Sequence, residues 1–242
     1  MSVSTHQSFK SIEKVSRWLL NAIVAGIVVN ILSLIVPIIQ NIEFLVRNEM
    51  VLTYLGSEPF DAFLNVIATI INFVIGVVTL FWFYSANKNI HSFGAKKVSS
   101  PRMAVIWFFI PILNLWKPYT VAQQIWKASN TQTIMSEGTE WKNSPSSKKI
   151  KFMWILGLTH LLISIVFGYY FALGNVWDEF MNNEETVVNF QRFYTLIFYG
   201  NLINIVGMVL GIFFQIFYLQ IVRQISLWQE TIGKTDSSLK RV

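Results

Sequence analysis

The sequence contains no cysteine among its 242 residues. A disulfide, a thiolate nucleophile and a cysteine-ligated metal site are therefore excluded. Histidine is nearly as scarce, with three copies, and neither a His-Glu-x-x-His motif nor a paired His–carboxylate spacing occurs. A Gly-rich phosphate loop and a Gly-x-Ser-x-Gly motif are missing as well. We expect no metal, no cofactor and no catalytic site, because the sequence lacks the residue patterns that such chemistry needs.

Charged residues are also few. They make up 13% of the chain, whereas soluble domains carry about a quarter. Charge is absent from four windows, residues 18–40, 62–84, 152–173 and 194–222. Each window has the roughly 20 residues that a spanning helix requires, and a helix satisfies every backbone polar group within such a segment. The sequence predicts an all-α integral membrane protein, with residues 1–242 forming a single membrane domain of four spans.

The distribution of charge predicts the orientation of these spans. With both termini in the cytoplasm, 17 of the 19 lysines and arginines lie inside, and only Arg47 and Arg192 lie outside. Eight of the 13 acidic residues fall in the outer loops. Because basic residues resist translocation, this asymmetry favours cytoplasmic termini. It also accounts for the net charge of +6 without nucleic acid, which would need a basic patch on a soluble fold.

A fifth apolar run, residues 103–116, is too short to span. If it did cross the membrane, the basic residues near position 148 would lie outside, against the charge rule. Ser100-Pro101 is typical of a helix start, and Pro111 is expected to kink or end that helix. Asn114 suits a turn. Lys117-Pro118 can then begin a second, amphipathic helix that turns Gln123, Gln124 and Lys127 away from its apolar face.

We therefore predict a kinked helical hairpin over residues 100–130, on the cytoplasmic side between the second and third spans. It either lies flat in the interface or dips into the bundle as a re-entrant segment. Lys117 is the charge nearest its apolar part, and the cost of burying an unpaired ammonium favours the flat arrangement. The candidate motif residues are Ser100, Pro101, Trp107, Pro111, Asn114, Trp116, Lys117, Pro118, Tyr119 and Trp126. They serve either a gate or a turn at the interface, and the latter is favoured since tryptophan commonly anchors interfaces.

Each span also carries a stripe of small and polar residues at helical spacing. In the first span the stripe includes Asn30, Ser33 and Pro37. The principal candidates overall are Asn30, Asn65, Asn72, Gly76, His160, Asn204, Gly207 and Gly211. We expect the stripes to meet inside a four-helix bundle, where such residues let helices approach and hydrogen-bond. The alternative is a pathway for a small solute. His160 is interpreted as a packing residue instead of a proton relay, because a relay needs partners.

Residues 82–130 hold a more specific pattern. It comprises Trp82, Asn89, Gly94, Ser100-Pro101, the run WFFIPILNLWKPY and the run IWKAS. This pattern resembles the bacterial membrane-protein family called domain of unknown function 4328. The run VRQISLWQE at residues 222–230 is similar to the usual ending of that family, whereas Arg102-Met103 departs from its small or aromatic residues. The resemblance implies a bacterial multi-span membrane protein and no defined activity.

Three function classes follow from these observations. We favour a non-enzymatic scaffold or accessory component of the bacterial inner membrane, in contact with lipid and compatible with a homo- or hetero-oligomer. Its basic stretches suit anionic headgroups. The alternative is a small-solute transporter or channel lined by the polar stripes, although no carboxylate lies within the four windows. An intramembrane enzyme is disfavoured, because amides, hydroxyls and one imidazole are the only polar groups there.

Overall fold

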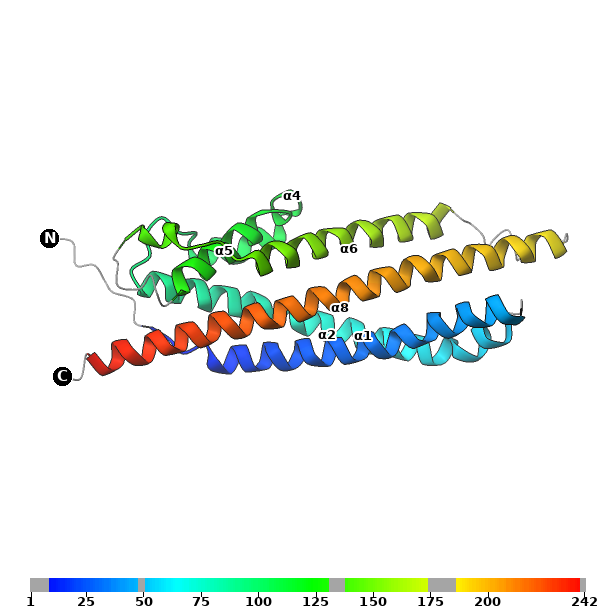
Figure 1. Cartoon of the computed structure of the whole chain (residues 1–242), viewed down its shortest axis with the longest axis horizontal. Coiled ribbons are helices and arrows are strands. Elements are labelled where there is room, and N and C mark those ends of the chain that lie inside the picture. Colours follow the sequence, from blue (N-terminus) through cyan, green and yellow to red (C-terminus); the bar gives the residue numbers. More distant parts are fainter. Residues whose placement is uncertain (1–8, 48–50, 131–137, 174–185, 240–242) are drawn as a thin grey trace. The chain divides into compact units, whose positions relative to one another are not determined.

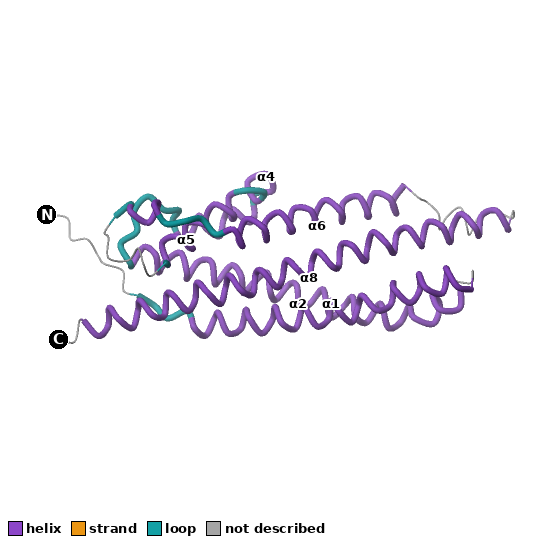
Figure 2. The backbone as a smooth tube through the Cα atoms, viewed as in Figure 1, coloured by secondary structure: helices purple, strands orange, loops and turns teal. Residues whose placement is uncertain are grey.

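A computed structural model describes residues 9–47, 51–130, 138–173 and 186–239. Its long helices are α1 (Glu13–Arg47), α2 (Val51–Ser92), α6 (Lys148–Leu173) and α8 (Thr186–Leu239) (Figure 1). The short elements between α2 and α6 are α3 (Pro101–Ile106), η1 (Trp107–Phe109), α4 (Pro111–Asn114), α5 (Lys117–Ser129) and η3 (Glu140–Asn143). No strand forms within the described ranges, which contain one isolated bridge between Ala95 and Gly138 (Figure 2).

Four helices in the described part of the chain are long and apolar enough to cross a membrane. They are Glu13–Val46, Pro59–Ser92, Lys148–Gly168 and Phe198–Thr235. At most 28% of each apolar window is buried, so large apolar side chains cover much of the surface, as is typical of a surface that contacts lipid. The predictions of an all-α fold and of four apolar spans are confirmed.

Helix α8 continues well past its predicted window. The charge-free window ends at Val222, but the helix runs on to Leu239 and has 54 residues in all. At 1.5 Å per residue it is about 80 Å long, whereas the hydrocarbon layer is about 30 Å thick. The absence of charged residues identifies the part of the helix that lipid can surround, and it does not show where the helix ends. Propagation adds a backbone hydrogen bond for each residue, so a helix can continue into a charged segment.

The chain folds into two compact units. Unit 1 comprises Met1–Val24, Asn72–Trp154 and Ile216–Val242, and unit 2 comprises Ala25–Ile71 and Ile155–Gln215. Unit 1 contains the short elements and the most deeply buried large side chains, including Trp82, Leu19 and Ile225. Among the residues of unit 2 whose burial is described, the buried apolar ones are fewer and include Val36 and Leu64. Unit 1 therefore resembles a packed soluble core more closely than unit 2 does.

Candidate functional site

The hairpin of unit 1 begins at a glycine turn and a capped helix. Gly94 has φ +86°, and the amides of Gly94 and Ala95 donate to the carbonyls of His91 and Ile90, which closes α2 as a Schellman motif does. The Ser100 hydroxyl then accepts a hydrogen bond from the Met103 amide at 3.3 Å, and Pro101 stands in the first turn of α3. The predicted Ser-Pro helix start is confirmed.

The first helical run ends directly before Pro111, which is one of the two predicted outcomes, but its α-helical part is shorter than predicted. The α-helix ends earlier, at Ile106, and tightens into the 3-10 turn η1. Ile110 is extended, with φ −100° and ψ 106°, because a residue before proline is restricted to that region. Pro111 then occupies the first turn of α4 and begins this helix instead of kinking a longer one. Asn114, predicted in a turn, is instead the last residue of α4, and the turn before α5 follows at Leu115 and Trp116.

The second helix of the hairpin, α5, starts where the sequence predicts it. Pro118 lies in its first turn and is buried, while Trp116 occupies the N-cap position and is exposed. The Lys117 ammonium lies 5.2 Å from the centre of the Trp107 ring. Such a cation–π contact contributes about 0.5–1 kcal/mol at an exposed site. Lys117 therefore joins the two arms of the hairpin.

The tip of the hairpin is apolar and uncovered in the protein. Phe109 and Ile112 are each 69% exposed, and Ile106 and Leu115 are exposed as well. Beside this tip, the Trp154 indole of α6 donates to the Leu115 carbonyl at 2.8 Å. The Leu115 carbonyl lies in the break between α4 and α5, so this hydrogen bond holds the irregular backbone against α6.

Aromatic pairs attach α5 to both neighbouring long helices. The rings of Tyr119 and Trp154 lie 6.1 Å apart, which links the start of α5 to α6. The rings of Trp126 and Trp228 lie 4.7 Å apart in an edge-to-face arrangement, which links the end of α5 to α8. Such pairs contribute about 0.5–1.5 kcal/mol beyond their burial. Two of the predicted motif residues therefore hold α5 in place.

Two glutamines of α5 correct the predicted polar face. Gln123 is buried, and its side chain exchanges two hydrogen bonds with the backbone of Ser147, at 2.9 and 3.0 Å. Gln124 is half-buried and accepts from the Ser99 amide at 3.0 Å. A glutamine side chain presents a donor and an acceptor together, so it can pair with a peptide group. Both residues therefore bind neighbouring backbone instead of facing water.

A network of buried amide side chains lies beside the hairpin. Asn89 exchanges two hydrogen bonds with the backbone of Lys10 and donates to Gln229 Oε1 at 3.1 Å. Gln229 Nε2 donates to the Ala86 carbonyl at 3.0 Å and to the Ser129 hydroxyl at 2.8 Å. The network joins the segment before α1 with α2, α5 and α8. Its residues were missing from our predicted sites, although Asn89, Ser129 and Gln229 all lie in the runs that carry the family resemblance.

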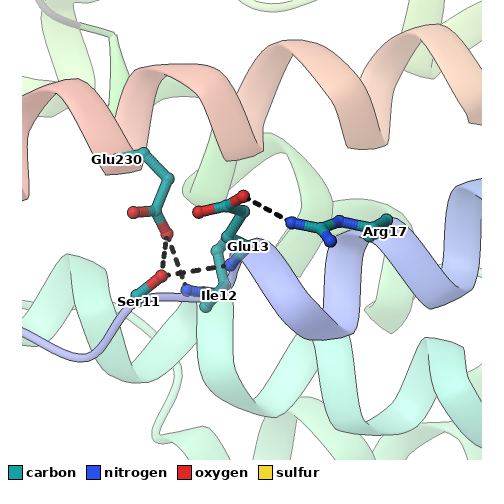
Figure 3. A network of polar contacts seen from close by, with 5 residues as sticks. All are labelled: Ser11, Ile12, Glu13, Arg17 and Glu230. Carbon is teal, nitrogen blue, oxygen red and sulfur yellow. Dashed lines mark hydrogen bonds and ion pairs between the residues drawn. The ribbon is translucent and has the colours of Figure 1, made fainter.

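Two smaller networks fix the start of α1 in unit 1. The Ser16 and Ser226 hydroxyls lie 2.7 Å apart, and the Trp82 indole donates to Ser226 at 3.1 Å. The Glu230 carboxylate of α8 accepts from the Ser11 hydroxyl at 2.8 Å and from the Ile12 amide at 2.7 Å (Figure 3). This carboxylate also lies near the N-terminus of α1, where a negative charge interacts favourably with the helix dipole.

The stripes of α1, α6 and α8 meet within unit 2. Asn30 donates to Gln215 at 3.1 Å, which joins α1 to α8. A methyl group added to Gly207 would lie 3.6 Å from Ile163, and one added to Gly211 would lie 3.6 Å from His160. Both are ordinary van der Waals distances, so α6 and α8 are in contact here with room for an alanine-sized side chain at either glycine. Asn204 is half-buried on α8.

The stripe of α2 behaves differently. Asn65, Asn72 and Gly76 are all exposed, and no atom lies within 4 Å of a methyl group added to Gly76. The structure therefore does not bring these residues against another helix among the described residues. The described ranges also contain no group of three or more His, Cys, Asp or Glu side chains that could bind a metal ion.

Comparison with known proteins gives one match. Residues 52–226 match the family described as Domain of unknown function (DUF4328). No curated protein and no solved structure matches the chain. The family match covers the whole hairpin together with Asn89 and Ser129, and it ends just before Gln229. Because it covers well over half of the 242 residues, the chain belongs to the DUF4328 family.

Proposed function

We propose that the protein is a non-enzymatic scaffold or accessory component of the bacterial inner membrane. The observation that carries this proposal is the network around Gln229. Its amide joins α2, α5 and α8, and Asn89 adds the segment before α1. Hydrogen-bonding groups that could otherwise meet a substrate here bind other parts of the chain. Such a network suits a rigid platform that presents the hairpin.

The partner in this proposal is the lipid of the cytoplasmic leaflet. The exposed tip residues Phe109 and Ile112 suit acyl chains, and adjoining exposed apolar side chains are typical of interaction surfaces. The basic residues nearby, including Arg102 and Lys117, suit anionic headgroups, at about 1 kcal/mol per charge near the surface. We infer that the hairpin lies in the interface, with Lys117 at the level of the phosphates.

Spin labels test this placement of the hairpin. Cysteines replace Phe109, Ile112 and, as a control on an exposed polar residue, Lys142, and each carries a nitroxide in anionic vesicles. We expect the labels at 109 and 112 to collide with dissolved oxygen more than with a water-soluble nickel chelate, and the label at 142 to show the opposite. Equal preference for the nickel chelate at all three positions contradicts lipid contact by the hairpin.

The alternative function, a small-solute transporter or channel, has one observation in its favour. The amides of Asn65 and Asn72 are exposed on an apolar helix, and polar groups within spans often line water-filled pathways. Single cysteines at Thr69, Asn72 and Gly76 distinguish the two functions, since the sequence has no cysteine of its own. We expect at most slow reaction with a small hydrophilic thiol reagent. Rapid modification of all three would favour the transporter.

A further inference from the structure

Unit 2 contains buried polar groups on α1 that are unpaired within the described part of the chain. The Ser33 hydroxyl has no hydrogen-bond partner there, and neither amide atom of Asn41 has one. Ser33 is 3% exposed and Asn41 is 6% exposed. Other hydroxyls on long helices bond to their own backbone, as Ser164 does to the His160 carbonyl at 2.9 Å. Ser33 makes no such bond, so burying its unpaired hydroxyl costs about 1–3 kcal/mol of stability.

Pro37 lies between these two residues and frees a third polar group. Proline has no backbone N–H, so the Ser33 carbonyl, four residues earlier, lacks its usual helical donor. Residues 33, 37 and 41 follow each other at four-residue steps, which places them on one side of α1. A hydroxyl, a carbonyl and an amide therefore share this side, along about 12 Å of helix.

This side of α1 faces α8. Asn30 bonds to Gln215, Gln40 accepts from Asn201 at 3.0 Å, and the ring of Phe44 lies 5.1 Å from that of Phe198. Pro37 is spaced seven residues from both Asn30 and Phe44, so it shares their direction. The two amide pairs also fix the antiparallel register, which places the half-buried Asn204 at about the level of Pro37.

The chemistry of this cluster selects a neutral occupant. It offers donors and acceptors together, and no charged residue lies in the window 18–40 that could balance an ion. A bound water needs two to four polar partners, which the groups of the cluster and neighbouring waters supply together. Ordered water is also one of the means by which spanning helices satisfy a carbonyl freed by proline.

We propose that the α1–α8 interface of unit 2 holds a binding site, centred on Pro37, for neutral hydrogen-bonding molecules. The occupant is water or a small solute bearing a hydroxyl or amide group. Because these groups extend over about 12 Å of helix, a chain of waters or one solute molecule bridges the Ser33 carbonyl and hydroxyl to the Asn41 amide. The site goes beyond the scaffold function and does not depend on it, since a packed bundle and a transporter could each contain it.

Single-cysteine variants test the site, because the parent sequence has no cysteine. Ser33→Cys and Asn41→Cys are compared with Val36→Cys, which is buried and apolar, and with the exposed Ile35→Cys. The readout is the rate of reaction with a small hydrophilic methanethiosulfonate in lipid nanodiscs. We expect rates at 33 and 41 at least tenfold above both controls. Rates no higher than that of Val36→Cys overturn the proposal.

A second variant guards against misfolding of the Ser33 substitution. Pro37→Ala restores the missing donor, so adding it to Asn41→Cys should slow labelling several-fold, and an unchanged rate contradicts the central role of Pro37. Every variant must also elute from size exclusion as the parent protein does. The labelling of Asn41→Cys is then repeated with glycerol present, because glycerol is a small solute with hydroxyl groups. A slower reaction would show that a small solute occupies the site, and an unchanged rate would show that water does.

Discussion

At the scale of single residues, the side chain of Gln229 bonds to three different residues of unit 1. Gln229→Leu removes one acceptor from the Asn89 amide and one donor each from the Ala86 carbonyl and the Ser129 hydroxyl. Buried groups left unpaired cost about 1–3 kcal/mol, so we expect lower thermal stability in detergent. Gln220→Leu on the exposed side of α8 is the matched control. Equal melting temperatures for the two variants would show that the network does not stabilise unit 1.

The opposite effect is expected at Asn87. This residue is fully buried, and neither of its amide atoms has a partner among the described residues. It is isolated, unlike Ser33 and Asn41, which share one helix side with a freed carbonyl, so it offers few contacts to a water. Asn87→Leu should therefore raise stability by about 1–3 kcal/mol, measured as an increase in melting temperature. A decrease would mean that Asn87 has a hydrogen-bond partner after all.

Single residues also show where prediction from sequence stops. Ser100 was predictable as a cap because capping depends on residues within one turn. The partners of Gln123 and Gln229 were not, because an amide can pair with any peptide group that the fold brings near. The four spans follow from absence of charge, a local property. Exposure of Asn72 depends instead on which helices become neighbours, and one sequence does not specify this.

At the scale of elements, the hairpin depends on Pro111. Pro111→Ala removes the restriction on Ile110, so the helical conformation can continue from η1 into α4. We expect the two arms to move apart, measured as a longer distance between spin labels at the exposed positions Arg102 and Thr120. Pro101→Ala, at a helix start that tolerates alanine, is the control. An unchanged distance in Pro111→Ala would assign the break to the hydrogen bond from Trp154 to the Leu115 carbonyl.

A second prediction at this scale concerns the contact between α6 and α8. A methyl group added to Gly157 would lie 3.0 Å from the Phe214 ring, whereas one added to Gly168 meets no atom within 4 Å. Overpacking costs about 1–3 kcal/mol, so Gly157→Ala should lower the melting temperature. Gly168→Ala should raise it slightly, because alanine favours helix over glycine by roughly 0.5–1 kcal/mol. The reverse order would contradict close packing at Gly157.

At the scale of the whole molecule, the prediction concerns orientation in the membrane. Cysteines at Ser57 and Asn182 should react with an impermeant thiol reagent applied outside cells, and cysteines at Ser92 and Ser146 should react only after lysis. The reason is the excess of lysine and arginine on one side. Asn182 lies outside the described residues, so its labelling follows from sequence alone. Reaction of Ser146→Cys in intact cells would mean that the hairpin region crosses the membrane.

The bond between Glu230 and the start of α1 has a consequence for synthesis. Its partners, Ser11 and Ile12, are 219 and 218 residues away in the chain. A ribosome adds about 5–20 residues per second, so Glu230 is synthesised on the order of 10–40 s after the residues at the start of α1. Gln229 arrives equally late. Unit 1 is therefore completed only after residue 230 has been synthesised, and a product truncated before it would leave the beginning of α1 and the Asn89 amide without these partners.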